Sequence, residues 1–241
     1  MVKVLTYNVS WQSMTGNKTN WILCNNKNDE SNNRHFTKCI RNIANLIDTN
    51  GYGLDFIALQ EASNYKILID MSETLKNMKY LVAKSGLEEV ITFWNPEKYC
   101  LKKYYNGEFK KGRIYQVLLF NNDIIFINIH SEHYKYDVLI KKLDKILEDI
   151  FNFNKSDKLN ILKHKYRIVI AGDFNNEIEK KINLNNINFY THDNLNTCCY
   201  NTFLYKFDHV IDSKAKPLYA KIPKVNKLTS DHLPLLVELI D

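Results

Sequence analysis

Short runs of apolar and β-branched residues recur along the chain, and polar segments separate them. Runs of about four to eight such residues predict strands, and near-continuous apolar runs predict strands that are buried on both faces. The predicted strands are Val2–Val9, Asp55–Gln60, Tyr80–Ala83, Val90–Trp94, Gln116–Phe120, Ile124–His130, Arg167–Gly172, Asp208–Ile211 and Leu235–Ile240.

Two other segments repeat apolar residues at helical spacing. One contains Phe36, Ile40, Ile43, Ala44 and Ile47 and ends near Gly51, and the other contains Leu139, Leu143, Ile146, Leu147 and Ile150. Many strands with a few long helices predict a layered α/β architecture. Because no repeat or low-complexity linker divides the sequence, we expect one domain over residues 1–241. Polar loops are expected at about residues 10–33, an insertion, and at Asn152–His164.

Composition narrows the class of protein only a little. Hydrophobic residues make up 45% and charged residues 25%, as in globular proteins, and the formal charge of +6 is compatible with a polyanionic partner. Apolar runs such as Ile124–Ile129 are too short to span a membrane, and no signal-peptide core follows Met1. The five cysteines include the adjacent Cys198 and Cys199, a poor pair for a disulfide, and favour reduced thiols. We expect an intracellular protein, in the cytoplasm or nucleus, and a monomer.

Acidic, amide and imidazole side chains gather where the predicted strands begin or end. Carboxylates at the ends of buried strands are costly unless they are paired or bound to a cation. Any one of them has a plain structural explanation, such as a turn or a cap, but the whole set is hard to explain in that way. Because it is rich in oxygen and lacks cysteine, it favours Mg²⁺ or Mn²⁺ over structural zinc. The set is Asn8, Glu61, His130, Asp173, Asn175, Asp208, Asp231 and His232.

Four short motifs in this set occur in a fixed order along residues 2–240. They are Leu5-Thr6-Tyr7-Asn8-Val9, Leu59-Gln60-Glu61, Gly172-Asp173-Phe174-Asn175 and Ser230-Asp231-His232-Leu233-Pro234. Together they resemble the endonuclease/exonuclease/phosphatase superfamily of DNase I-like enzymes. The resemblance implies a four-layered α/β sandwich, in which two mixed β-sheets pack face to face with helices outside.

The resemblance also implies a metal centre and a position for water. Glu61 would be the principal ligand of Mg²⁺ or Mn²⁺, with Asn8 beside it and Asp231 facing the same site. Asp173 would orient or deprotonate the attacking water, and Asn175 would donate to a phosphate oxygen. A cation and an imidazolium would together stabilise the charge that develops at phosphorus.

Two histidines have roles implied by the same resemblance. His232 would sit on the scissile phosphate, paired with Asp231 or its neighbours, and Asp208 would either position a histidine or bind a second metal. His130 resembles the histidine of the DNase I, sphingomyelinase and phosphoinositide-phosphatase branches, and imidazole can transfer protons near neutral pH. Gly172, before Asp173, is expected to leave room for a substrate phosphate at the backbone.

Weaker matches point toward DNase I. Glu88 lies where that enzyme carries a glutamate that partners its histidine, and Glu89 is the competing choice. Arg113 precedes a predicted strand, as an arginine precedes the equivalent strand of DNase I, which suggests a contact with phosphate. The basic run that contains it either tracks a phosphate backbone or is an ordinary solvated hairpin. That run comprises Lys102, Lys103, Lys110, Lys111 and Arg113, with Tyr104 and Tyr105 interleaved.

The insertion is a departure from the family pattern. Ser10 stands two residues after Asn8, where some repair branches carry an acidic residue, so a second-metal ligand there is in doubt. Trp11 or Trp21 could stack on a base or ring of the substrate, or could simply pin the insertion to the body.

Three functions remain open from the sequence. The first is a divalent-metal-dependent phosphodiesterase acting on nucleic acid or a nucleotide-derived diester. The second is a phosphatase or phosphodiesterase for a small molecule or lipid headgroup, such as an inositol phosphate. The third is a non-catalytic binding module on the same fold, which the intact set of acidic and imidazole residues disfavours.

Overall fold

The structure of the chain, a computed structural model, describes residues 1–16, 35–153, 165–191, 195–199, 203–214, 218–225 and 229–240. Its helices are α1 (Trp11–Thr15), α2 (His35–Asn50), α3 (Tyr65–Met71), α4 (Glu73–Lys76) and α5 (Tyr136–Phe153). Its strands are β1 (Val2–Asn8), β2 (Phe56–Gln60), β3 (Lys79–Ser85), β4 (Glu88–Trp94), β5 (Leu101–Lys110), β6 (Arg113–Phe120), β7 (Ile124–His130), β8 (Arg167–Asp173), β9 (Lys181–Leu184), β10 (Ile187–Thr191), β11 (Asp208–Asp212), β12 (Leu218–Lys221) and β13 (Leu235–Leu239).

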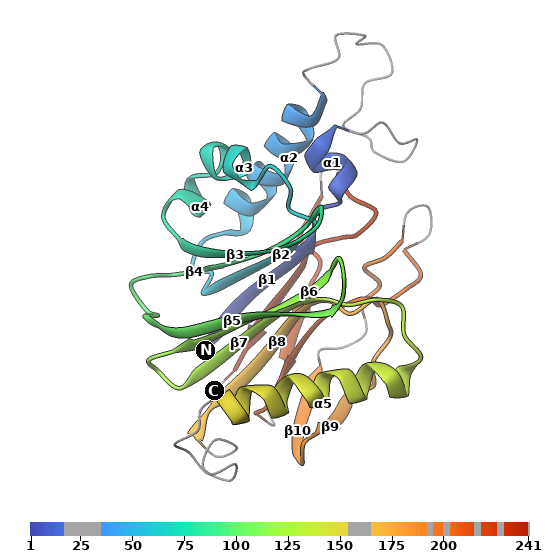
Figure 1. Ribbon diagram of the computed structural model, residues 1–241. Helices are drawn as coiled ribbons and strands as arrows, with labels where there is room; N and C mark the ends of the chain where they lie inside the picture. Colours follow the sequence, from blue (N-terminus) through green and yellow to red (C-terminus); the bar gives the residue numbers. More distant parts are fainter. Residues whose placement is uncertain are drawn as a thin grey trace.

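The strands form two mixed sheets that pack face to face (Figure 1). One has the order β12-β13-β1-β2-β4-β3, and the other has the order β5-β6-β7-β8-β11-β10-β9. Each sheet contains one parallel pair, β1 with β2 and β7 with β8. Helices α1 to α4 cover the outer face of the first sheet, and α5 covers that of the second (Figure 1). The expected four-layered α/β sandwich is therefore confirmed.

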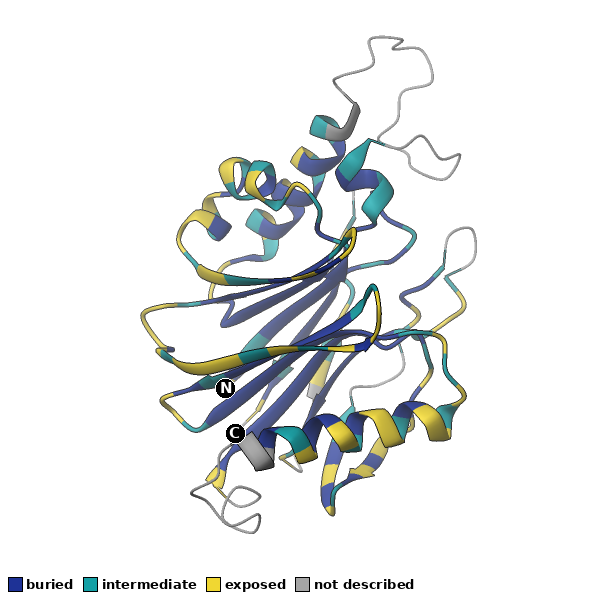
Figure 2. Cartoon of the chain, in the orientation of Figure 1, coloured by how far each residue is buried: buried dark blue, intermediate teal, exposed yellow. Residues whose placement is uncertain are grey.

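Successive residues of the central strands face two different buried layers, which explains why these strands are apolar throughout. Val4 on β1 faces the second sheet, where it packs in the same cluster as Phe126 and Val169. Its neighbour Leu5 faces the helices and packs with Ile40 and Ile43 of α2. Because both faces of these strands are buried, as Figure 2 shows, neither face needs polar residues.

The elements that the sequence pattern missed are mostly short or exposed. Strand β5 is mainly exposed and polar, so it lacks the apolar run that marks a buried strand. It forms a hairpin with β6, as the plain interpretation of the basic run predicted. Residues 11–15 of the expected polar insertion form α1 instead of a loop, and α5 continues to Phe153, into the second expected loop. The rest of both loops, including Trp21, lies outside the described residues.

Gly172 has a packing role that differs from the expected one. Its φ of +142° suits glycine, and a Cβ there would lie 2.0 Å from the carbonyl oxygen of Ile129. The missing side chain thus lets β7 and β8 pair closely, with Ile129 directly opposite Gly172. The space beside Gly172 is filled by this neighbouring strand, so the expectation that it receives a phosphate is wrong.

Two expectations from composition have different outcomes. Among the described helices, none has the length and apolarity needed to cross a bilayer. The structure joins Cys198 to Cys199 in a disulfide, and Cys100 is a free cysteine. The expectation that all the thiols are reduced is therefore wrong for this structure.

Candidate active site

Strand pairing brings the predicted site residues to one edge of the sandwich. Parallel pairing of β1 and β2 sets Asn8 opposite Gln60, directly before Glu61. Parallel pairing of β7 and β8 sets His130 opposite Asp173, and antiparallel β11 sets Asp208 opposite Asp173. In Figure 1 this edge lies beside α1. The structure places all ten predicted residues in one strand-end cluster: Asn8, Glu61, Glu88, Arg113, His130, Asp173, Asn175, Asp208, Asp231 and His232.

His130 lies between a carboxylate and a guanidinium. Its Nδ1 is 2.7 Å from Oε1 of Glu88, so Glu88 and not Glu89 is the partner. Glu89 instead pairs with Lys84 at 2.7 Å. Nη1 of Arg113 lies 3.1 Å from the same Nδ1 and still closer to Nε2. The side chain is almost fully buried, which lowers its pKa, but Glu88 and the other nearby carboxylates outweigh that burial and raise the pKa of His130.

Asp173 is the centre of the cluster. Its Oδ1 accepts the backbone N–H of Asn175 at 2.8 Å, and its Oδ2 accepts the side-chain N–H of Asn8 at 3.0 Å. The same Oδ2 lies 3.5 Å from Nε2 of His130 and 3.6 Å from Nε2 of His232. Two imidazoles, one at the end of β7 and the other in the segment before β13, therefore converge on one carboxylate oxygen.

His232 is positioned by Asp208. Its Nδ1 lies 2.7 Å from Oδ2 of Asp208, which favours the histidine-positioning alternative for this aspartate. Burial lowers the pKa of His232, but the charges of Asp208, Asp173 and Asp231 raise it to about 10. The imidazole is thus a cation at neutral pH, and its Nε2–H faces the cluster.

Glu61 is held in a demanding backbone conformation. Its φ of 58° lies in the left-handed region, which costs a residue other than glycine about 1–2 kcal/mol. Its Oε2 accepts the N–H of Trp11 at 2.7 Å, and its Oε1 accepts the side-chain N–H of Asn8 at 3.3 Å. Strain of this kind gathers at functional sites, and here it directs a partly exposed carboxylate into the cluster.

The donor set fits a hard divalent cation. The pKa of Asp231 is raised by burial and by the charges of Glu61 and Asp173, although His232 opposes this. Such repulsion among partly buried carboxylates is relieved by a cation. Among the described residues, three groups have potential ligand atoms within 4.8 Å of one another, and two of them contain carboxylates: Glu61, Glu88 and His130, and Asp173, Asp208 and His232. In this structure the oxygen of Asn8 accepts the N–H of Ser10, so Asn8 bridges two carboxylates as a donor.

A broad groove of about 620 Å³ is lined by Glu88 and Arg113, the two partners of His130. The β3–β4 turn forms one wall, and the β5–β6 turn, with Lys111 and Arg113, forms the other. The two turns are tied by a hydrogen bond from the N–H of Gly112 to Oγ of Ser85 at 3.0 Å. Trp11 and Glu61 close the groove toward the cluster, so the groove is continuous with the site.

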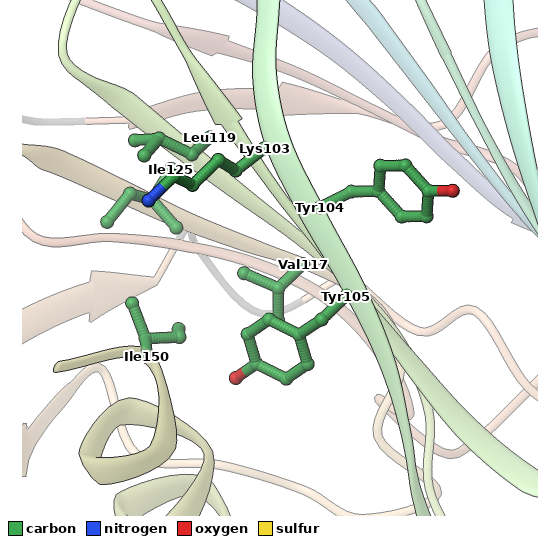
Figure 3. A pocket seen from close by; sticks show the side chains of 7 residues that line it. All are labelled: Lys103, Tyr104, Tyr105, Val117, Leu119, Ile125 and Ile150. Atoms are coloured by element: carbon green, nitrogen blue, oxygen red, sulfur yellow. The ribbon is translucent and has the colours of Figure 1, made fainter. Parts of the chain in front are cut away.

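A second hollow is too small to be a substrate site. It measures about 20 Å³, roughly the space of one water molecule, and it lies under the outer face of the second sheet (Figure 3). Tyr105, Val117 and Ile150 enclose it (Figure 3). Of these two hollows, the groove lined by Glu88 and Arg113 is the better candidate for substrate, because it is larger and reaches Glu61 of the cluster.

Two residues that contact the site, Ser230 and Cys198, had no role assigned from the sequence. Oγ of Ser230 donates to the carbonyl of Asn8 at 2.7 Å and accepts the N–H of His232, which fixes the turn between them. Its place inside the Ser-Asp-His-Leu-Pro motif was an available signal. Sγ of Cys198 lies 3.5 Å from Nε2 of His232, and no sequence signal indicated this contact.

Comparisons with known proteins agree with this architecture. No known family profile matches the chain. It is 32% identical, over 259 aligned positions, to protein L684 of Acanthamoeba polyphaga mimivirus; the match covers 98% of the chain and 50% of L684. The chain thus spans about half the length of this curated relative.

Solved structures resemble the chain over nearly its whole length. Truncated TDP2 from Caenorhabditis elegans has a TM-score of 0.68 at 13% identity, covering 98% of this chain and 96% of that one. ANGEL2, described as a 2′,3′-cyclic phosphatase, has a TM-score of 0.68 at 14% identity, covering 98% and 94%. An endonuclease/exonuclease/phosphatase family protein from Bacteroides thetaiotaomicron has a TM-score of 0.60 at 16% identity, covering 98% and 93%. The chain therefore has the DNase I-like fold of the endonuclease/exonuclease/phosphatase superfamily.

Proposed function

We propose that the chain is a divalent-metal-dependent phosphoric ester hydrolase that cleaves phosphodiester bonds of nucleic acid or of a nucleotide-derived substrate. The observation that carries the proposal is the convergence of two imidazoles, from His130 and His232, on one oxygen of Asp173. Asp173, as a base for water, thus lies next to His130 and His232, two donors for a phosphate. The phosphatase activity in the description of ANGEL2 supports the general class.

In this proposal Mg²⁺ or Mn²⁺ is held mainly by Glu61, with Asp231 and Asn8 beside it. When bound, the cation supplies positive charge to the phosphate and offsets the repulsion among the carboxylates. The oxygen-rich donors suit these hard cations.

Asp173 orients the attacking water and accepts its proton at Oδ2. The two neighbours that hold this carboxylate, Asn8 and the backbone N–H of Asn175, fix the direction of attack. As water adds to phosphorus, the bond to the leaving oxygen breaks in line with it. The side chain of Asn175, which donates to the carbonyl of Ser131 at 3.0 Å, has a second N–H for a phosphate oxygen.

The two imidazoles have different roles toward the phosphate and the leaving oxygen. His232, with a pKa raised to about 10, stays charged and donates from Nε2 to a non-bridging phosphate oxygen. His130 gives its Nε2 proton to the leaving oxygen, while Glu88 holds Nδ1. Arg113, beside Nε2 of His130, contacts the same phosphate.

Metal dependence tests the proposal. Purified chain is assayed with Mg²⁺, Mn²⁺ or excess chelator against duplex DNA, RNA, a dinucleotide, a 2′,3′-cyclic nucleotide and inositol phosphates. We expect cleavage of at least one nucleotide diester that needs the metal, and strong salt dependence if the substrate is long nucleic acid. Full activity in chelator would remove the mechanism, and activity confined to inositol phosphates would favour the headgroup alternative.

Glu61→Gln should raise the metal concentration needed for half-maximal rate and lose most activity.

Glu88 and Glu89 provide a matched pair of variants. Glu88→Gln should lower kcat about tenfold or more, because the carboxylate that orients His130 and favours its charged form is lost. Glu89→Gln removes an ion pair with the largely exposed Lys84 and should leave kcat within about twofold. Steady-state kinetics on the same diester compares them. Equal losses in the two variants would mean that Glu88 has no special part in the reaction.

A further inference from the structure

Three aromatic side chains form a ledge on the flank of the cluster that carries Asp208. The rings of Tyr205 and Phe207 stack with centroids 5.1 Å apart and planes at 20°, and His133 packs edge-on to Phe207 at 5.3 Å. Tyr205 remains 50% exposed, and the apolar clusters found among the described residues contain none of these three side chains. This aromatic ledge therefore presents π-surface to solvent without contributing to the core.

The ledge is attached directly to the catalytic edge. The N–H of Phe174, the residue after Asp173, donates to the carbonyl of Phe207 at 2.8 Å. Tyr205 exchanges backbone hydrogen bonds with Cys198, whose Sγ contacts Nε2 of His232. Backbone hydrogen bonds thus join Phe207 to the residue after Asp173, and Tyr205 to the residue that contacts His232.

The opposite flank of the cluster has different chemistry. Strand order places β6, with Arg113, on one side of β7 and β8, and β11, with Asp208, on the other. Arg113 and Lys111 make the β6 flank cationic, whereas the exposed groups of the ledge are mainly aromatic. Lys206, between Tyr205 and Phe207, adds one charge there.

We propose that the aromatic ledge binds the nucleobase attached next to the scissile phosphate, which places the ring on the His232 flank and any further phosphates over the cationic β6 flank. Every nucleobase has a flat π-face, so stacking on Tyr205 selects nucleotides over sugar phosphates without selecting a sequence. The inference rests on the proposed hydrolase function and names the group that its substrate must carry.

A binding experiment tests the ledge without relying on turnover. Calorimetry measures the affinity of AMP and of ribose 5-phosphate, which lacks the base, for the wild type and for Tyr205→Ala. We expect the variant to bind AMP about tenfold more weakly, since base stacking on an aromatic side chain has an effect of that order. Its affinity for ribose 5-phosphate should stay within about twofold. Tyr205→Phe should restore AMP binding, and Tyr52→Ala is the control, because Tyr52 is an exposed tyrosine at the other end of β2 from Glu61.

Kinetics with a dinucleotide gives the second readout. We compare an adenine dinucleotide with two analogues, each of which has one base replaced by hydrogen. Tyr205→Ala should raise KM for the dinucleotide and for one analogue only, which also identifies the nucleoside on the ledge. Equal loss of affinity for AMP and ribose 5-phosphate, or an equal fall in kcat for all three substrates, would contradict base binding by the aromatic ledge. Tyr205 would then be a structural support of Cys198. If no diester is cleaved but AMP binding responds as expected, the proposed hydrolysis fails and the ledge stands.

Discussion

Asp173→Asn is expected to lower kcat by about 10²–10⁴ and to change KM by less than about threefold. The carboxylate is the base for water, and asparagine has the same shape but almost no basicity. The missing interaction belongs mainly to the transition state, so binding in the ground state should survive. Steady-state kinetics on a cleavable diester with saturating Mg²⁺ measures both constants.

The same variant has a predictable cost in stability. Two donors, the N–H of Asn175 and the side chain of Asn8, each use one oxygen of Asp173. Asparagine offers one oxygen, so one buried donor loses its acceptor at a cost of about 1–3 kcal/mol. A melting curve should show a small drop in Tm, and kinetics are measured well below it. Weaker binding at unchanged kcat would instead make Asp173 a holder of substrate or metal.

His232→Ala is expected to lower kcat by about 10²–10⁴, because a charged donor to the phosphate is lost. Its removal also leaves Asp208 fully buried without its partner, and breaking a buried ion pair by removing one member costs about 3–5 kcal/mol. The single variant is therefore paired with Asp208→Asn/His232→Ala, in which the buried charge is removed as well.

The double variant separates chemistry from folding. If Asp208 acts through His232, the double variant should be no slower than His232→Ala and should melt at a higher temperature. Kinetics and thermal melts on the wild type, His232→Ala and the double variant give this comparison. A double variant that folds well and keeps wild-type kcat would show that His232 is a structural residue.

The pattern of apolar residues along the chain predicted the central strands and the two long helices, because these elements bury large faces. Val4 and Leu5 of β1 face different layers, and such double burial leaves a continuous apolar signal. Edge strand β5 has one exposed face and a polar composition, so its hairpin depends on pairing with β6. Short α1 and α4 are too brief for a helical period to show.

The candidate site was visible in sequence because strand ends gather at sheet edges. Asn8, Glu61 and Asp173 follow apolar strands directly, so topology alone brings them together. The choice between Glu88 and Glu89 needed the structure, since adjacent residues on a strand face opposite sides.

Other features of the edge depended on tertiary contacts that sequence does not show. The stack of Tyr205 on Phe207 arises in a segment without regular structure, positioned by hydrogen bonds to Cys198 and Phe174. The role of Gly172 was misjudged because nothing in the sequence shows that Ile129 lies directly against it.

The central claim is that water, oriented by Asp173, attacks phosphorus within the strand-end cluster. Hydrolysis of a nucleotide diester in water enriched in ¹⁸O, followed by mass spectrometry of both products, tests it most directly. The account predicts one ¹⁸O atom per cleaved bond in the phosphate-bearing product and none in the alcohol product, with the reaction dependent on added metal. Label in the alcohol product, or cleavage without incorporation of label into phosphate, would contradict it.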